Sequence, residues 1–336
     1  MIASGNCRVL VVGRDYVYHG VREIVAELAT AFGADAVSVP IAPENAWYGM
    51  LRRFPRAAEA LLSVIHGRRI AQLEKQQFDI VLFIQVHEIS EALVVRYRNA
   101  FPSARFILYY WDSLATHDYR RYVKHFDETW TFDPSDARSN AQLTHLPTFF
   151  CDRFKALRYS DAFRYDLAFV GTIMTVARYD RVMEFRRWAS ENGIKFIDYL
   201  YVSPLFYLRA LLGGRLFRGV HFRPVPEERL VEIYGQARAV LDLPNNTQSG
   251  YTPRVFESLG AHRMLVTTKA EIVDEDFYDS RSVFVLGRDG AFPPVAFLRS
   301  KPVFSSGIEQ YSLRNWLRRL LCLELRVGTA AEDLGT

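Results

Sequence analysis

The sequence predicts an α/β protein with two domains, each built around a parallel β-sheet. Two observations predict this class. Short apolar segments rich in Val, Ile and Phe recur along all 336 residues and alternate with amphipathic stretches of helix length, a pattern typical of buried parallel strands. The segments form two series, and the chain is long enough for two domains.

The first series predicts strands at residues 8–12, 36–39, 79–84, 105–110 and 128–132. The second predicts strands at residues 167–170, 195–199, 221–223, 239–243, 264–267 and 283–286. Residues 152–165 lack periodicity, so we place one Rossmann-like domain at residues 1–160 and another at residues 161–308. Trp316, Leu317, Leu320 and Leu321 have helical spacing and predict a C-terminal helix within residues 309–325, followed by a flexible tail at residues 326–336.

Composition and charge exclude several classes of protein. Apolar residues make up 49% of the chain and charged residues 24%, which excludes intrinsic disorder. The net charge of +4, from 42 basic and 38 acidic residues, is too balanced for a dedicated nucleic-acid-binding protein. The chain shows no apolar run of spanning length, no secretory leader and only three scattered cysteines, so we expect a cytoplasmic protein.

Ligands of open parallel sheets bind beyond the carboxyl ends of the strands, which limits the candidate residues to a few loops. In the first domain these loops hold Gly13-Arg14-Asp15, His87-Glu88, Asp112-Ser113 and Asp133-Pro134. In the second domain they hold Gly171-Thr172, Val225-Pro226, Asn245-Asn246 and Thr267-Thr268. We therefore expect chemistry in a cleft between the two domains. The absence of a dinucleotide-binding GxGxxG and of a P-loop motif disfavours NAD dehydrogenases and P-loop enzymes.

The most informative motif is the loop and helix at residues 248–260. Thr252-Pro253 predicts a helix start, with an N-cap followed by proline at the first helical position. The N–H groups of this helix end suit a diphosphate, Arg254 would add a charge-assisted contact, and Glu257 could accept hydrogen bonds from a ribose diol. The alternative is that Glu257 only complements the helix dipole and that Arg254 is solvated.

Further segments extend this motif into a resemblance. They are Tyr109-Tyr110-Trp111-Asp112-Ser113, Thr131-Phe132-Asp133-Pro134, Phe169-Val170-Gly171-Thr172 with Arg178, Val225-Pro226-Glu227-Glu228, Leu241-Asp242-Leu243-Pro244, Asp276-Phe277-Tyr278 and residues 311–317. Their order over about residues 75–320 resembles bacterial GT-B glycosyltransferases (group 1 type, CgeB-like), of the subgroup for capsule and lipopolysaccharide biosynthesis.

The resemblance implies a GT-B fold, with two Rossmann-like domains facing across a cleft and a C-terminal helix that crosses back to the first domain. It implies a metal-independent glycosyltransferase without a cofactor. The second domain would bind a nucleotide-diphosphate sugar as donor, and the first domain would bind a glycan or lipid-linked saccharide acceptor.

The resemblance also assigns donor-binding residues. Glu257 matches the glutamate that holds the ribose, and Gly171, Thr172 and Arg178 would meet the diphosphate. Val225 and Pro226 would lie along the edge of the nucleotide base. The remaining residues of the donor set are Asn245, Gln248, Ser249, Gly250, Tyr251, Thr252 and Arg254. Ser249 replaces the first glutamate of the Glu-x7-Glu motif of retaining members, so that motif predicts no stereochemical course here.

Asp112, His87 and Glu88 are the candidate catalytic residues. A sugar hydroxyl is a weak nucleophile, so an inverting transferase needs a positioned base. We favour Asp112 because it follows a strand inside a matching segment. The alternatives are that Asp112 caps the next helix and that His87 is structural.

Asp274-Glu275-Asp276 spells the DxD pattern by which the other major glycosyltransferase fold binds metal. Its position before Phe277-Tyr278 favours an acidic surface turn instead. We expect no essential metal.

Two segments carry the positive charge. Residues 47–69 hold five arginines and one glutamate, and residues 200–223 hold four arginines and no acid, so each has a net charge of +4 and the rest of the chain −4. Their interleaved aromatic and aliphatic side chains suit an anionic membrane surface, which would place the protein peripherally on the inner face of the cytoplasmic membrane. The alternative is core-facing helices whose arginines extend to solvent.

Two other functions remain open at the level of sequence. Sugar-nucleotide epimerases share the two-domain architecture, and the missing glutamate leaves room for a non-catalytic scaffold that binds a sugar nucleotide or polysaccharide.

Overall fold

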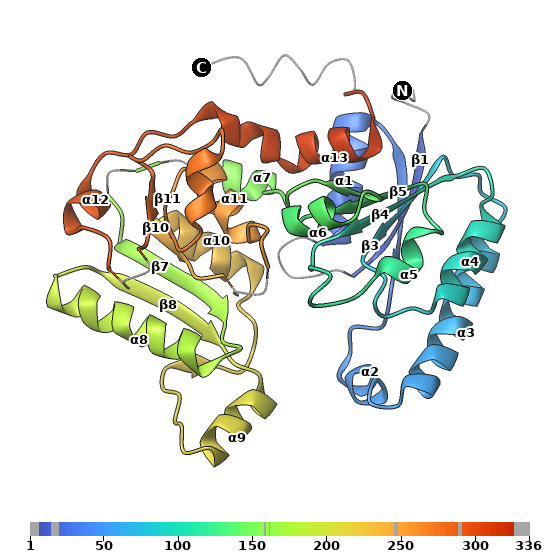
Figure 1. Cartoon of the computed structure of the whole chain (residues 1–336). Helices are drawn as coiled ribbons and strands as arrows, with labels where there is room; N and C mark the ends of the chain where they lie inside the picture. Colours follow the sequence, from blue (N-terminus) through green and yellow to red (C-terminus); the bar gives the residue numbers. More distant parts are fainter. Residues whose placement is uncertain are drawn as a thin grey trace. The chain divides into compact units, whose positions relative to one another are not determined.

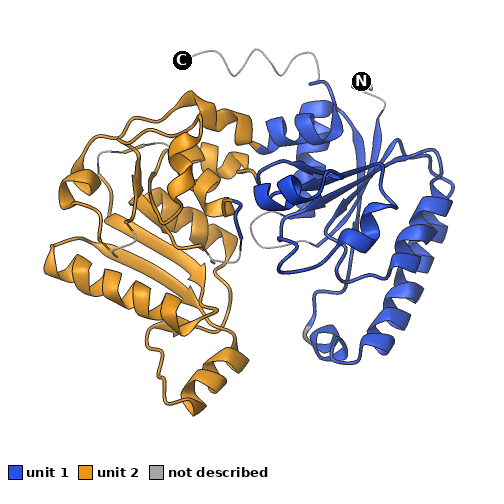
Figure 2. Ribbon diagram, viewed as in Figure 1, with its two compact units in different colours: residues 1–148, 246–250, 313–336 blue, residues 149–245, 251–312 orange. Residues whose placement is uncertain are grey.

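The computed structural model describes residues 7–14, 20–157, 159–160, 162–244, 248–287 and 291–325. The chain divides into two compact units (Figure 1, Figure 2). Unit 1 comprises residues 1–148, 246–250 and 313–336, and unit 2 comprises residues 149–245 and 251–312. Asp15, Asn245 and the tail expected at residues 326–336 lie outside the described residues.

Unit 1 is built on a six-stranded parallel sheet in the order β2-β1-β3-β4-β5-β6. Its strands are β1 (Arg8–Gly13), β2 (Asp35–Pro40), β3 (Ile80–Ile84), β4 (Arg105–Tyr110), β5 (Glu128–Thr131) and β6 (Leu143–His145). Every residue of β3 is buried, and β1 and β4 are buried beyond their first residues. This burial explains the continuous apolar segments of the sequence.

Seven helices of unit 1 fall within the described residues. They are α1 (Val21–Phe32), α2 (Ala46–Leu51), α3 (Pro55–Leu73), α4 (Glu91–Ala100), α5 (Arg120–Val123), α6 (Pro134–Ser139) and α13 (Leu313–Leu321). The last helix, α13, buries Trp316 against Tyr109, with ring centroids 4.7 Å apart. Arg314 also forms an ion pair with Glu27 of α1 at 2.8 Å. These contacts join the C-terminal helix to the first unit, as the resemblance implies.

Unit 2 is built on a second six-stranded parallel sheet, in the order β12-β11-β10-β7-β8-β9. Its strands are β7 (Tyr165–Thr172), β8 (Phe196–Tyr201), β9 (Val220–His221), β10 (Ala237–Asp242), β11 (Met264–Thr267) and β12 (Val283–Val285). The two sheets confirm the predicted pair of Rossmann-like domains.

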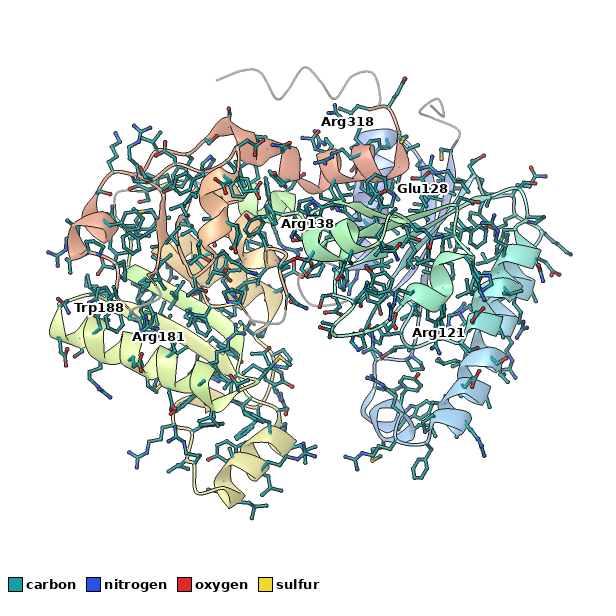
Figure 3. The ribbon with its side chains drawn as sticks, in the orientation of Figure 1. Arg121, Glu128, Arg138, Arg181, Trp188 and Arg318 are labelled. Atoms are coloured by element: carbon teal, nitrogen blue, oxygen red, sulfur yellow. The ribbon has the colours of Figure 1, made fainter. Side chains whose placement is uncertain are left out.

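Six α-helices and two 3-10 helices of unit 2 lie within the described ranges. They are α7 (Asp152–Lys155), α8 (Val176–Glu191), α9 (Pro204–Leu212), α10 (Glu227–Gln236), α11 (Pro253–Gly260), α12 (Val295–Arg299), η1 (Ala270–Asp274) and η2 (Ser306–Tyr311). Arg181 and Trp188 of α8 (Figure 3) both contact Phe292, since the indole stacks on that ring at 5.2 Å and the guanidinium lies 4.8 Å from its centroid.

Among the described helices, none has both the length and the apolar composition to cross a membrane.

The units divide between Thr148 and Phe149, whereas the sequence analysis places the domain boundary after residue 160. Phe150 accounts for the earlier division. Its N–H donates to the Tyr311 carbonyl at 3.0 Å, and its side chain is part of a core cluster of unit 2. A Cβ at Gly260 would lie only 2.5 Å from the Phe150 ring, so this glycine permits the close packing.

Candidate functional site

The carboxyl edge of the unit 2 sheet brings three of the predicted donor-binding residues together. Gly171 lies near the end of β7, Arg178 lies in the first turn of α8, and Arg254 lies in the first turn of α11. A Cβ at Gly171 would lie 3.2 Å from Nη2 of Arg178 and 3.4 Å from Nη2 of Arg254. Both guanidinium groups also lie over the Phe169 ring, at 5.7 and 5.6 Å from its centroid. Two cations therefore converge on one glycine.

Arg254 is held in place by a buried carboxylate that the sequence analysis did not single out. Asp242, at the end of β10, has no exposed surface and accepts a hydrogen bond from Nη1 of Arg254 at 2.7 Å. The other two guanidinium nitrogens donate to the Val170 carbonyl at 2.7 and 3.1 Å. Arg254 is therefore not the solvated side chain of the alternative interpretation.

The Asp242 carboxylate also organises the start of α11. It accepts hydrogen bonds from Oγ1 of Thr252 at 2.8 Å and from Oγ1 of Thr267 at 3.1 Å. Thr252 is the N-cap and Pro253 the first helical residue, as predicted, but the Thr252 hydroxyl bonds Asp242 and makes no cap hydrogen bond. The Thr252 side chain therefore does not accept a hydrogen bond from the N–H groups in the first turn of α11.

The two arginines differ electrostatically. Burial, followed by repulsion from Arg254, lowers the pKa of Arg178 to about 10. Burial also opposes the charge of Arg254, but Asp242 and other acidic neighbours raise its pKa overall. Both side chains are cationic at neutral pH, and an anion bound at Gly171 would relieve their mutual repulsion.

Glu257 lies in the interior of unit 2 and is 4% exposed. The Tyr234 hydroxyl of α10 donates to its Oε2 at 3.4 Å. Burial raises the pKa of Glu257 to about 7, although Arg254 and Arg153 oppose this shift. The carboxyl group is thus more than a surface partner of the helix dipole.

The other donor candidates are scattered. Thr172 is exposed, Val225 is buried, and Pro226 is the exposed N-cap of α10. The Tyr251 hydroxyl donates to Oε1 of Glu275 at 2.8 Å.

Gln248, Ser249 and Gly250 belong to unit 1. Asp133, the N-cap of α6, accepts hydrogen bonds from the N–H groups of Ser249 at 2.8 Å and Gly250 at 3.4 Å, and from the Ser249 hydroxyl. Nε2 of Gln248 donates to Oδ1 of Asp112 at 3.4 Å. These three residues are thus hydrogen-bonded to Asp112 and Asp133 in unit 1, which holds the candidate catalytic residues.

The carboxyl ends of β3 and β4 bring the catalytic candidates of unit 1 together. Nε2 of Gln85 donates to Oδ2 of Asp112 at 2.5 Å, and Gln85 adopts a left-handed backbone with φ of 64°. Nδ1 of His117 lies 3.7 Å from the same Oδ2. Asp112 does not cap a helix, because the next helix, α5, begins at Arg120. The left-handed backbone of Gln85 is a strained conformation of the kind that clusters at functional sites.

His87 stacks on His117, with ring centroids 4.4 Å apart and an interplanar angle of 15°. Burial, and then repulsion from His117, lowers the pKa of His87 below its usual 6.5. Glu88 is committed to two cations instead, since it forms ion pairs with Arg14 and, at 3.3 Å, with Arg52. A neutral imidazole can accept a proton at pH 7, so His87 is better suited to that task than Glu88.

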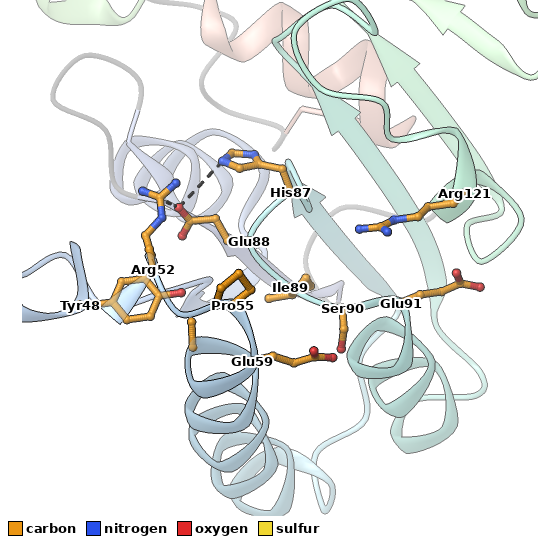
Figure 4. A pocket seen from close by; sticks show the side chains of 11 residues that line it. Tyr48, Arg52, Pro55, Glu59, His87, Glu88, Ile89, Ser90, Glu91 and Arg121 are labelled. Carbon is orange, nitrogen blue, oxygen red and sulfur yellow. Dashed lines mark ion pairs between the residues drawn. The ribbon is translucent and has the colours of Figure 1, made fainter. Parts of the chain in front are cut away.

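A cavity of about 370 Å³ in unit 1 opens beside these residues (Figure 4). It is bounded by Tyr48, Arg52, Pro55, Ala58, Glu59, His87, Glu88, Ile89, Ser90, Glu91 and Arg121. Two of its three carboxylates are paired with cations, Glu88 with Arg14 and Arg52 and Glu91 with Lys124 and His125. The cavity thus offers both hydrogen-bond donors and acceptors.

The acidic segment at residues 274–276 packs against η2. The carboxylate of Asp276 accepts hydrogen bonds from Gln310 and, at 3.4 Å, from the Tyr311 hydroxyl. Within the described ranges, no group of three His, Cys, Asp or Glu side chains is arranged to hold a metal ion.

Sequence reasoning missed Asp242, His117 and Gln85 as members of these clusters, and it offered Asp133 as a strand-end candidate without assigning it a role. Asp242 stands at the end of β10, which was a usable signal. The stacking of His117 and the left-handed backbone of Gln85 have no sequence signature.

No family model matches the sequence, and no curated protein matches it. Solved structures do. An α,α-trehalose-phosphate synthase (UDP-forming) from Burkholderia vietnamiensis has 12% identity, with 94% of this chain and 99% of that chain covered and a TM-score of 0.56. A structure described as trehalose-6-phosphate from E. coli bound with UDP-2-fluoro glucose has 10% identity, 95% and 100% coverage and a TM-score of 0.55.

A complex of S. aureus MnaA with UDP has 10% identity, covers 94% of this chain and 95% of that chain, and has a TM-score of 0.50. These likenesses extend over nearly the whole of each chain. Together with the two six-stranded parallel sheets and the C-terminal helix in unit 1, they show that the chain has the GT-B fold.

Proposed function

We propose that the chain is a glycosyltransferase that moves a sugar from a nucleotide-diphosphate sugar to a glycan or a lipid-linked saccharide, in the biosynthesis of bacterial capsule or lipopolysaccharide. The observation that carries the proposal is the convergence of Arg178 and Arg254 at Gly171. The absence of a side chain there lets an anion approach the backbone and both guanidinium groups at once.

Unit 2 would bind the donor. Arg178 and Arg254 would hold the diphosphate, and the N–H groups at the start of α11 would stabilise the charge that develops as it leaves. Tyr251, Thr252 and Glu257 would complete the donor site, with Glu257 on the ribose. The UDP and UDP-2-fluoro glucose of the similar structures make uridine nucleotides the first donors to test.

Unit 1 would bind and activate the acceptor. His87, whose pKa is lowered by burial, would take the proton of the attacking hydroxyl. Asp112 would hold His117, on which His87 stacks, and Gln85 and Gln248 would fix the Asp112 carboxylate. The neighbouring cavity, lined by hydrogen-bonding side chains, suits a saccharide.

The test is nucleotide binding by isothermal titration calorimetry, preceded by a thermal-shift screen with UDP-, GDP-, dTDP- and CMP-sugars. Arg178→Gln should weaken binding of the best nucleotide at least tenfold, because it removes a charge-assisted contact. Arg187→Gln is the matched control, since Arg187 lies exposed on the same helix. Equal nucleotide affinities for the two variants would contradict the assignment of Arg178 to the donor diphosphate.

A sugar-nucleotide epimerase is the second candidate, because the chain is also similar to a putative UDP-N-acetylglucosamine 2-epimerase from Listeria monocytogenes, with 12% identity, 94% of this chain and 95% of that chain covered and a TM-score of 0.50. Incubation with the donor alone separates the two functions. An epimerase converts the donor without acceptor, whereas a transferase gives slow hydrolysis at most.

We also propose that the protein works at the inner face of the cytoplasmic membrane, where lipid-linked acceptors are found. In the segment at residues 47–69, Trp47, Met50 and Phe54 are exposed beside Arg53 and Arg56. An apolar surface rimmed by cations is typical of a membrane interface.

A further inference from the structure

Helix α9 of unit 2 is apolar on both faces. Its inner face, with Phe206, Tyr207 and Ala210, packs on the core of unit 2. On its outer face Leu208 is 51% exposed and Leu212 is 80% exposed. A nine-residue helix on the surface of a soluble domain would normally carry polar residues on its outer face. The outer leucines therefore need a partner.

Leu216 and Phe222, which follow the helix in the chain, are also exposed, and Phe222 contacts Tyr207 of the helix. We use the name α9 surface for the exposed apolar side chains of this segment, which are Leu205, Leu208, Leu211, Leu212, Leu216 and Phe222. Contiguous exposed apolar patches mark interaction sites, whereas single exposed leucines do not.

The α9 surface is bordered by cations. Arg209, Arg218 and Arg223 are exposed, and no acidic residue occurs between positions 200 and 223. Arg215 is the exception among the arginines of this segment, because it is paired with Asp180 of α8. The other three form no ion pair with any residue that the structure describes.

The loop after α9 is held by hydrogen bonds and ring contacts, so the surface is preformed. The Tyr179 hydroxyl accepts from the Arg218 N–H at 2.8 Å, and the Tyr199 hydroxyl donates to the Arg223 carbonyl at 3.2 Å. Tyr207 supports Phe222 in an edge contact at 5.1 Å. Little ordering is then required when a partner binds.

We infer that the α9 surface docks on an anionic lipid bilayer, with its leucines among the acyl chains and its arginines at the phosphate headgroups. The inference names the contact element for the proposed membrane location and does not depend on glycosyl transfer. Apolar side chains supply burial and each arginine near an anionic surface adds electrostatic attraction.

A second copy of the chain fits this surface poorly. In a two-fold symmetric contact each patch meets itself, so Arg209, Arg218 and Arg223 of one copy would face the same cations of the other. Like charges brought together at an interface oppose association. A bilayer of anionic lipid satisfies both the apolar and the cationic parts.

The test is co-sedimentation of the full chain with vesicles of phosphatidylcholine alone or mixed with phosphatidylglycerol. We expect binding to the mixed vesicles only. Leu208→Ser with Leu212→Ser should weaken that binding about tenfold or more. Arg209→Gln and Arg218→Gln should each weaken it about fivefold. Val273→Ser and Arg187→Gln, which alter exposed residues outside the α9 surface, should bind as wild type.

Two outcomes overturn the inference. Equal sedimentation of wild type and the leucine variant with mixed vesicles shows that α9 is not the contact element. A wild-type dimer in light scattering that the leucine variant abolishes identifies the surface as an interface between copies. Nucleotide affinity, measured on the same variants, should be unchanged. Vesicle binding without nucleotide binding would leave this inference standing and end the proposed function.

Discussion

Arg254 and Asp242 form an ion pair inside unit 2, with Nη1 of the arginine 2.7 Å from Oδ1 of a carboxylate that has no exposed surface. The same guanidinium lies beside Gly171, so the pair links the interior of the sheet to the candidate anion site. Removing one member of a buried ion pair leaves the other charge desolvated without compensation. The ion pair therefore both stabilises the fold of unit 2 and positions the Arg254 guanidinium at the candidate anion site.

Asp242→Asn should lower the free energy of unfolding by about 3–5 kcal/mol, because Arg254 then keeps a buried charge without a counterion. Urea denaturation measures this loss. Asp180→Asn is the control, since its partner Arg215 is 49% exposed at the side chain and surface pairs contribute about 1 kcal/mol or less. Similar losses in both variants would contradict a structural role for the buried pair.

Gly171→Ala should weaken nucleotide binding about tenfold or more. Its Cβ would lie 3.0 Å from the Phe169 ring and 3.2 Å from Nη2 of Arg178, so the guanidinium must move away from the backbone. Titration calorimetry with the best nucleotide measures the effect.

The matched control for that substitution is Gly49→Ala, because a Cβ at Gly49 of α2 meets nothing within 4 Å. Nucleotide affinity should be unchanged there, and stability should rise by about 0.5–1 kcal/mol. Unchanged affinity in both variants would show that no ligand approaches Gly171.

Eleven strands were predictable from the sequence through their short apolar segments. The signal is strongest for strands such as β3 and β11, which are buried throughout and have almost no polar residues. The twelfth, β6, was missed, since two of its three residues are exposed and it lies at the edge of the sheet. Its single buried residue, Leu143, leaves no periodic signal.

The rule that ligands bind at the carboxyl ends of strands selected Gly171, whereas Arg254 was selected by the predicted helix start at Thr252-Pro253 and Arg178 by the resemblance alone. The partners of Ser249 could not be predicted in this way. Its hydroxyl and N–H bind Asp133, 116 residues away in the chain, and nothing local in a loop indicates which distant acceptor it meets. The cluster around Asp112 likewise depends on tertiary contacts.

The unfolding free energy should depend on pH through Glu257. Burial raises the pKa of this carboxyl to about 7 from an ordinary 4.5. The folded chain therefore retains a proton that the unfolded chain has lost, and the stabilisation is complete below about pH 4.5 and lost as the pH rises through about 7. The change is on the order of 3 kcal/mol.

Denaturation of wild type and Glu257→Gln at pH 5 and pH 8 measures this contribution. Glutamine stays neutral, so the variant should lose much less stability at pH 8 than wild type. Glu228→Gln, at an exposed position of α10, should keep the wild-type dependence. An identical pH dependence in all three proteins would rule out a buried, titrating Glu257.

Transfer activity should be insensitive to EDTA. The carboxylates of the Asp274-Glu275-Asp276 segment are used in packing, since Glu275 accepts from Tyr251 and Asp276 from Gln310. Asp274 is exposed, and Asp274→Asn should leave kcat within about twofold of wild type. Activity that EDTA abolishes and Mn²⁺ restores would contradict a metal-independent mechanism.

His87→Gln should lower kcat by about 10²–10⁴, the usual contribution of a positioned base, while nucleotide affinity stays at the wild-type value. Burial and the neighbouring His117 lower the pKa of His87 from its usual 6.5, which favours the neutral imidazole. The kcat of wild type should therefore change little on the alkaline side of neutrality and fall as the solution becomes more acidic. His125→Gln is the control, because that imidazole is paired with Glu91 at the start of α4 and not with His87 or His117 in any contact that the structure describes. A kcat for His87→Gln equal to that of the control would transfer the role of base to Asp112, whose Asp112→Asn variant should then show the larger loss.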